Sequence, residues 1–117
     1  MTRAHVNRLY VLCVAALGLS LCGASSSVAQ GTRKHATYTV TIDASRFDLD
    51  VLTVKTGDTV VWVNKDIVAH TATSQAGGYD SGMIASCKSW KYSPKQAGEF
   101  PYTCTYHPTM KAMLRVK

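Results

Sequence analysis

Thr37-Tyr38-Thr39-Val40-Thr41-Ile42 is the stretch that decides the fold class, because threonine alternates in it with larger, mostly apolar side chains. A period of two residues places one set of side chains on each face of an extended chain. The stretch therefore predicts a half-buried β-strand over residues 37–42.

Further apolar runs follow at short intervals. Two of them cover residues 47–55 and 59–64, and the Gly57-Asp58 pair between them predicts a hairpin. Residues 64–89 are rich in Gly, Ser, Thr and Asp and predict loops with at most short edge strands. More strands are predicted at residues 90–92, 100–104 and 112–116. Short strands without helical periodicity predict an all-β sandwich of two sheets.

The first thirty residues differ in composition from the rest of the chain. Two arginines precede an apolar run over residues 9–22, and Ser27 and Ala29 stand where a signal peptidase cuts. The sequence predicts that residues 1–29 are a secretory signal peptide cleaved after Ala29. Residues 30–117 then form one small domain, which is too short for a two-domain enzyme.

Two alternatives to cleavage are open. An uncleaved anchor needs roughly 20 apolar residues to span a membrane. The run has 14, so we expect no stable membrane span. Lipid attachment at Cys22 is the second alternative, and the bulky Leu21 before it disfavours that reading.

The predicted domain is mildly basic. Without Arg3 and Arg8 it keeps 11 of the 13 basic residues and all 7 acidic ones, for a net charge of +4. Residues 81–117 hold six of these basic residues and a single acidic one, Glu99. Such a bias serves solubility or docking to an acidic partner. No nucleic-acid-binding pattern accompanies it, so no nucleic-acid partner is expected.

Cys87 and Cys104 are the two cysteines of the predicted domain. In a secreted protein they either pair or are protected in another way, such as metal ligation. A domain of this size can fold without a disulfide. A disulfide between them and a zinc site that adds His70 and His107 are both open alternatives.

Residues near Cys104 favour a copper site. Cys104, His107 and Met110 follow one another at intervals of three residues between two predicted strands, so their side chains can turn toward one point. With the distant His70 they offer two nitrogens, a thiolate and a thioether. Two His, one Cys and a weak Met form the ligand set of blue-copper electron-transfer sites, whereas zinc does not favour a thioether.

The combined motifs resemble the cupredoxin family and, within it, the amicyanin and plastocyanin group of small blue-copper proteins. The resemblance runs from the Gly57-Asp58 turn to the last predicted strand. It implies a Greek-key β-sandwich of about seven to eight strands. It also implies one type 1 copper ion held by four residues, His70, Cys104, His107 and Met110.

Some positions depart from the family pattern. Thr71 stands where many relatives have Asn, and we expect it to bond to Thr105 instead. Cys87 falls where relatives usually have the Gly of a turn. Met113 could compete with Met110 as the axial ligand, although the alternation of the last strand turns Met113 outward.

The resemblance implies a periplasmic electron carrier and not an enzyme. Cu(I)/Cu(II) cycling would pass single electrons between partners such as a cytochrome or a periplasmic dehydrogenase. His107 would be the partly exposed ligand, surrounded by Ile67, Val68 and Pro108, and the protein would be a monomer that docks transiently. The alternative function is a periplasmic copper carrier or chaperone that delivers copper to a cuproenzyme. The domain lacks the Met- or His-rich tract that carriers often add.

Overall fold

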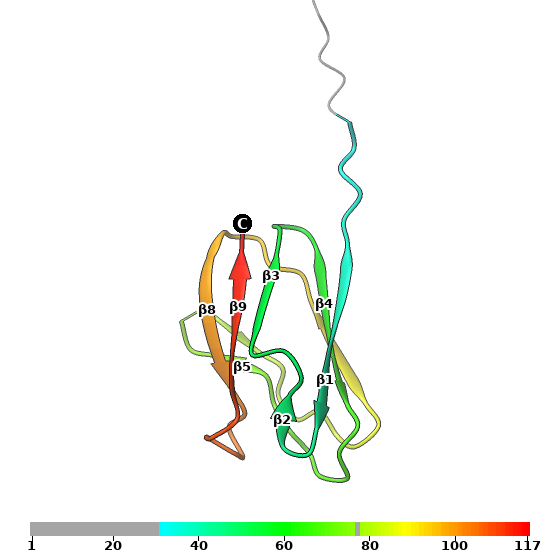
Figure 1. The fold of residues 1–117 in the computed structure, drawn as a ribbon, viewed down its shortest axis with the longest axis vertical. Coiled ribbons are helices and arrows are strands. Elements are labelled where there is room, and N and C mark those ends of the chain that lie inside the picture. Colours follow the sequence, from blue (N-terminus) through cyan, green and yellow to red (C-terminus); the bar gives the residue numbers. More distant parts are fainter. Residues whose placement is uncertain (1–30, 77) are drawn as a thin grey trace, which may run out of the picture. The chain divides into compact units, whose positions relative to one another are not determined.

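Nine strands and no helix make up the part of the chain that the computed structural model describes, residues 31–76 and 78–117 (Figure 1). The predicted signal peptide, with the cleavage after Ala29 and the alternative at Cys22, lies outside the described residues. Within them, no helix is long and apolar enough to cross a membrane. The predicted all-β fold is confirmed.

The strands form two sheets. In chain order they are β1 (Thr37–Asp43), β2 (Arg46–Phe47), β3 (Val51–Val54), β4 (Thr59–Asn64), β5 (Thr73–Ser74), β6 (Tyr79–Asp80), β7 (Ser89–Tyr92), β8 (Gly98–Thr103) and β9 (Lys111–Val116). One sheet has the order β2-β1-β4-β7 and the other β3-β9-β8-β5-β6. The total of nine exceeds the expected seven to eight, and three of these strands have only two residues each.

The expected hairpin around Gly57-Asp58 is wrong. β3 pairs in parallel with β9 in one sheet, while β4 lies between β1 and β7 in the other. Both β3 and β4 bury alternate residues, so their apolar faces meet across the sandwich instead of pairing edge to edge. A turn signal shows that the chain reverses, but it does not distinguish these two outcomes.

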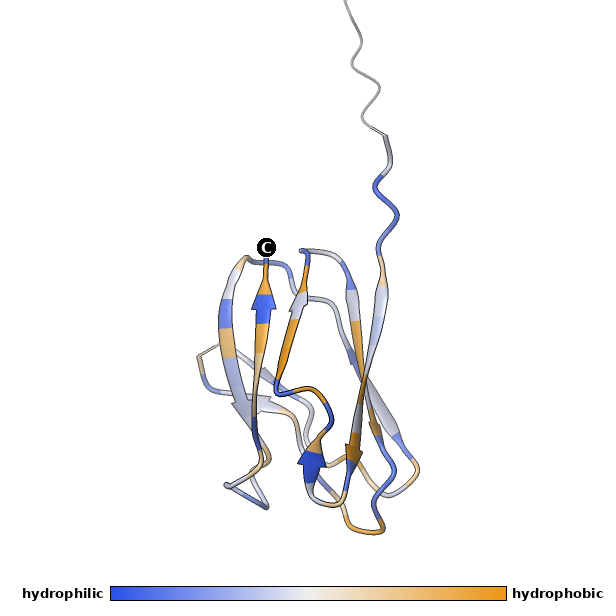
Figure 2. Cartoon of the chain, viewed as in Figure 1, coloured by the Kyte–Doolittle hydropathy of each residue, from blue (hydrophilic) through white to orange (hydrophobic). Residues whose placement is uncertain are grey.

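Alternate side chains of both sheets fill the space between them. The fully buried Trp62 of β4 packs edge-on against Tyr102 of β8, with ring centroids 5.6 Å apart, and so joins the two sheets. Burial raises the pKa of Tyr102 to about 12, so its hydroxyl stays neutral. Figure 2 shows apolar segments along β3, β4 and β9. This core supports the loops after β4 and β8 that carry the predicted ligands.

Candidate metal centre

Two loops bring the predicted ligands together. His70 lies in the segment after β4, where its N–H donates to the Ile84 carbonyl at 3.1 Å and its carbonyl accepts from the Ile84 N–H at 2.8 Å. Cys104 follows β8 directly. Its N–H donates to the Met110 carbonyl at 3.2 Å, and the Met110 N–H donates to the His107 carbonyl at 2.9 Å. These backbone bonds close the loop from Cys104 to Met110 tightly on itself.

Three donor atoms converge at this point. The Nδ1 atoms of His70 and His107 each lie 3.7 Å from the Cys104 Sγ, and the three residues offer ligand atoms within 4.8 Å of one another. His70 and Cys104 are fully buried and His107 is half-buried. The structure therefore assembles two imidazoles and a thiol from segments 34 residues apart.

The spacing of these atoms fits a shared metal ion. An ion about 2.0–2.1 Å from a nitrogen and about 2.3 Å from a sulfur, at angles of about 109–120°, separates the two by about 3.5–3.8 Å. The observed 3.7 Å lies in that range. A thiolate with two imidazoles is also a donor set that suits copper.

Met110 and Cys87 are two further residues considered from sequence. Met110 is buried at the end of the ligand loop, and its role as axial ligand stays a prediction. Cys87 is exposed, and both Cys87 and Cys104 are free thiols. Cys87 is also absent from the described cluster of potential ligands. These findings disfavour the disulfide and the four-ligand zinc site.

Thr71 links the two loops, and its expected bond to Thr105 is confirmed. The Thr71 Oγ1 accepts a hydrogen bond from the Thr105 N–H at 2.9 Å and lies 3.2 Å from the Thr105 hydroxyl. The Thr71 N–H donates to the Cys104 Sγ at 3.3 Å. Thr71 thus connects the His70 segment to both Cys104 and Thr105.

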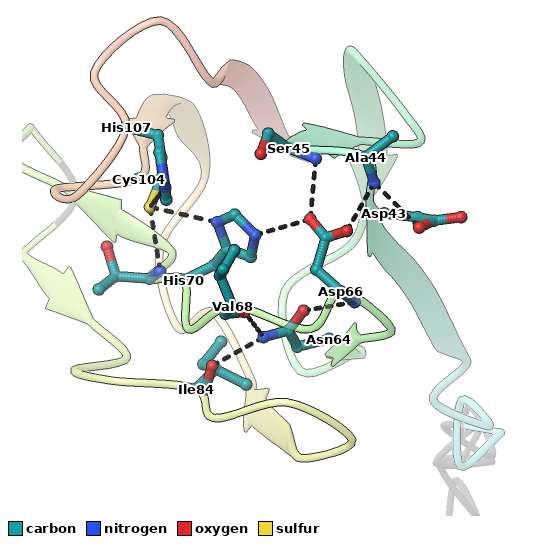
Figure 3. A network of polar contacts seen from close by, with 11 residues as sticks. Asp43, Ala44, Ser45, Asn64, Asp66, Val68, His70, Ile84, Cys104 and His107 are labelled. Carbon is teal, nitrogen blue, oxygen red and sulfur yellow. Dashed lines mark hydrogen bonds and ion pairs between the residues drawn. The ribbon is translucent and has the colours of Figure 1, made fainter.

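Sequence reasoning missed Asp66 and Asn64 as residues of the site. The Asp66 Oδ2 lies 2.7 Å from the His70 Nε2 (Figure 3). The buried Asn64 donates to the carbonyls of Val68 and Ile84 and accepts from the Asp66 N–H, which fixes the loop between them. The backbone hydrogen bond from Ser45 is the main cause that lowers the pKa of Asp66. The spacing Asp-x-x-x-His was visible, but it implies contact only when the loop curls back.

The same two loops expose apolar side chains. Ile67 is 93% exposed, and Val68 and Tyr106 are 44% and 53% exposed. Ile67 and Val68 precede His70, and Tyr106 precedes His107. The His70 and His107 rings lie 4.9 Å apart, so both loops border the same cluster. Exposed apolar residues gathered in this way are typical of interaction sites.

A two-sheet β-sandwich with a His-Cys-His cluster between two of its loops, in which His70 and Cys104 are fully buried, is the architecture of the blue-copper class of small proteins. Comparison with known families agrees with this class. The chain belongs to the family of cupredoxin-like domains, whose family model matches residues 12–116. The predicted resemblance to cupredoxins is therefore confirmed.

Individual relatives point to one branch of the family. The chain is 28% identical over 99 residues to amicyanin of Paracoccus denitrificans, an alignment that covers 80% of this chain and 72% of that protein. It is 26% identical over 83 residues to amicyanin of Paracoccus versutus, covering 67% of this chain and 63% of that protein. The chain thus spans less than two thirds of this second relative.

Solved structures of amicyanin variants have the same fold. A methionine-to-alanine variant with Cu(I) superposes with a TM-score of 0.65 at 25% identity, over 69% of this chain and 82% of that one. A proline-to-alanine variant in the oxidised state gives a TM-score of 0.65 at 26% identity, over 70% and 83% of the two chains.

Proposed function

We propose that this protein is a periplasmic electron carrier that holds one copper ion and passes single electrons between redox partners. The observation that carries the proposal is the buried Cys104 thiol, flanked at 3.7 Å by imidazole nitrogens of His70 and His107. Membership of the cupredoxin-like family and similarity to amicyanin, which has been solved with Cu(I), support copper as the metal.

His70, Cys104 and His107 would hold the copper, with Met110 as a weak fourth ligand. Copper bound by this donor set exchanges one electron between Cu(I) and Cu(II). The chain contributes a rigid frame, because its backbone bonds fix the ligand loop and Thr71 bridges it to the His70 segment. A frame that keeps the donor atoms in place limits rearrangement when the charge of the metal changes.

The half-buried His107 would be the side of the site nearest to a partner. Exposed Ile67, Val68 and Tyr106 belong to the same two loops and provide an apolar contact surface. The exposed Lys65 and the exposed Lys111, the first residue of β9, flank these loops and favour a partner with an acidic face, such as a cytochrome or a periplasmic dehydrogenase. Contacts of this kind are small and transient, consistent with a monomer.

Secretion belongs to the same proposal. Residues 1–29 would direct the chain to the periplasm and be cleaved after Ala29. Copper delivery, the alternative function, is less well supported, because His70 and Cys104 are fully buried. A recipient protein could not reach these two side chains without opening the loops.

Spectroscopy of the copper-loaded protein tests the proposal. One equivalent of Cu(II), added under non-reducing conditions, is expected to give an intense blue absorption band and a narrow copper hyperfine splitting in EPR. Cys104→Ser should lose both signals, and Cys87→Ser, which removes the other cysteine, should keep them. A colourless wild-type protein, or a Cys104→Ser variant that stays blue, contradicts the proposal.

A further inference from the structure

His70 is held from both sides of its ring. Its Nε2 lies 2.7 Å from the Asp66 Oδ2, and its Nδ1 lies 3.7 Å from the Cys104 Sγ. The imidazole is fully buried and the Asp66 side chain is 14% exposed. A buried ring with a carboxylate on one nitrogen has one favoured tautomer and one favoured orientation.

The other hydrogen-bond partners of the Asp66 carboxylate indicate which atom is the donor in its contact with His70. The Ala44 N–H donates to Oδ1 at 2.9 Å and the Ser45 N–H donates to Oδ2 at 2.8 Å. Backbone N–H groups can only donate, so both carboxylate oxygens already serve as acceptors. The Nε2–H of His70 then completes the set as a third donor, and in the neutral ring this tautomer has an unprotonated Nδ1, which lies 3.7 Å from the Cys104 Sγ (Figure 3).

The turn that supplies the two N–H groups has an uncommon backbone conformation. Ala44 and Ser45, between β1 and β2, have φ angles of 47° and 54°. Residues other than glycine adopt this left-handed region at a cost and need contacts that hold them there. The Asp66 carboxylate supplies such contacts at both residues.

We propose that Asp66 is a positioning residue that presets His70 as its Nε2–H tautomer, with Nδ1 directed at Cys104, before any metal binds. The β1–β2 turn anchors this carboxylate, and Asn64 fixes the backbone that carries it. The proposal rests on the proposed function in one respect, namely that the metal received by Nδ1 is copper. The state of the metal-free ring can be measured independently of copper.

Two consequences distinguish positioning from a merely structural role. Groups that orient a metal-ligating histidine typically contribute about 10- to 100-fold to metal affinity. A carboxylate on a ligand ring also favours the more highly charged Cu(II) over Cu(I), so its removal should raise the reduction potential. If Asp66 only supported the turn, its substitution would change the unfolding free energy and leave the metal affinity and the reduction potential unchanged.

The first experiment uses the metal-free protein. Long-range ¹H–¹⁵N correlation spectra near neutral pH are expected to show His70 as the Nε2–H tautomer in the wild type and as a mixture of tautomers in Asp66→Ala. Asp48→Ala is the matched control, because Asp48 accepts the Thr41 N–H at 2.9 Å on the neighbouring strand and lies outside the network of Figure 3. A wild-type His70 protonated on Nδ1, or a tautomer unaffected by Asp66→Ala, overturns the proposal.

The second experiment covers the case in which Asp66→Ala does not fold. Asp66→Asn keeps the shape and one acceptor oxygen but loses the charge. Its copper-loaded form should have a higher reduction potential than Asp48→Asn, and its Cu(I) affinity by chelator competition should be lower. Equal potentials for the two variants overturn the proposal. If the wild type binds no copper, the proposed function fails, while the tautomer measurement still decides the role of Asp66.

Discussion

Thr71 shows how one hydroxyl can connect the two halves of the centre. Its Oγ1 accepts from the Thr105 N–H at 2.9 Å and lies 3.0 Å from the Thr73 Oγ1, and the residue is 2% exposed. We expect Thr71→Val to lower the free energy of unfolding of the metal-free protein by about 1–3 kcal/mol, because the Thr105 N–H loses its acceptor. Urea denaturation followed by tryptophan fluorescence measures this change.

Thr71→Ser is the control for that variant, since it keeps the hydroxyl and loses a methyl group. It should recover most of the lost stability. Both variants keep the backbone N–H that donates to Cys104, so the blue band of the copper-loaded protein should persist in each. If Thr71→Ser is as unstable as Thr71→Val, packing and not the hydrogen bond explains the effect.

At the scale of residues, spacing within one loop is what the sequence made visible. Cys104 and His107 are three residues apart, and a tight loop between strands brings such neighbours together. The chemistry of cysteine and histidine then suggested a metal and a distant His70. Asp66 could not be identified in this way, because its contact with His70 depends on the Asn64 bonds that curl the loop.

Among the elements, the Gly57-Asp58 turn ties the segment before β1 to the end of β3. The Asp58 carboxylate accepts from the N–H groups of Ala36 and Lys55, each at 2.9 Å. The hydrogen bond from Ala36, followed by that from Lys55, lowers the pKa of Asp58 in the folded protein. The ionised carboxylate therefore stabilises the fold, and this stabilisation is lost as the pH falls through the folded pKa.

This lowered pKa predicts a pH dependence of stability. The contribution of Asp58 is fully present above its unfolded pKa of about 3.9 and declines below it. Asp58→Asn should be less stable than the wild type at neutral pH, with a shallower loss of unfolding free energy in acid. In this variant Asp66, whose pKa is also lowered in the folded protein, still causes part of the loss of unfolding free energy in acid. Equal slopes from pH 7 to about pH 2 would show that Asp58 does not contribute.

Gly57 of the same turn has a steric reason to be glycine. Its φ is 86°, and a Cβ there would lie 2.5 Å from the His35 Cε1. Gly57→Ala should lower the unfolding free energy by about 1–2 kcal/mol through its backbone conformation alone. Any further loss from the ring contact should disappear when His35→Ala is added. A double variant that regains full stability would place the whole cost on His35.

Element bounds followed from alternation, but element partners did not. The expected strand over residues 59–64 coincides with β4, and the alternation in residues 37–42 marks β1. Within the predicted run over residues 47–55 the chain crosses from one sheet to the other, because β2 ends at Phe47 in one sheet and β3 begins at Val51 in the other. Leu49 stands between Asp48 and Asp50 in this crossing, so apolar and polar residues alternate through it and the run looks like one strand.

For the whole molecule, pairings distant in sequence determine where the site forms. β1 pairs with β4 and β3 with β9, both in parallel, and the second pairing joins residues more than fifty positions apart. The proposed ligands His70 and Cys104 belong to segments 34 residues apart, which separate on unfolding. A metal that binds the folded chain and not the unfolded one must therefore stabilise the entire domain.

Copper removal provides the test at this scale. With free Cu(I) at about 1,000 times its dissociation constant, the folded protein should gain about 4 kcal/mol of unfolding free energy over the metal-free form. Cys104→Ser should lose most of this gain, because the thiolate is the strongest donor of the set. Cys87→Ser should retain it, since Cys87 is exposed and outside the cluster. Denaturation curves of the three proteins, recorded with and without Cu(I), measure this gain in unfolding free energy. If Cys104→Ser keeps the gain, the copper binds elsewhere.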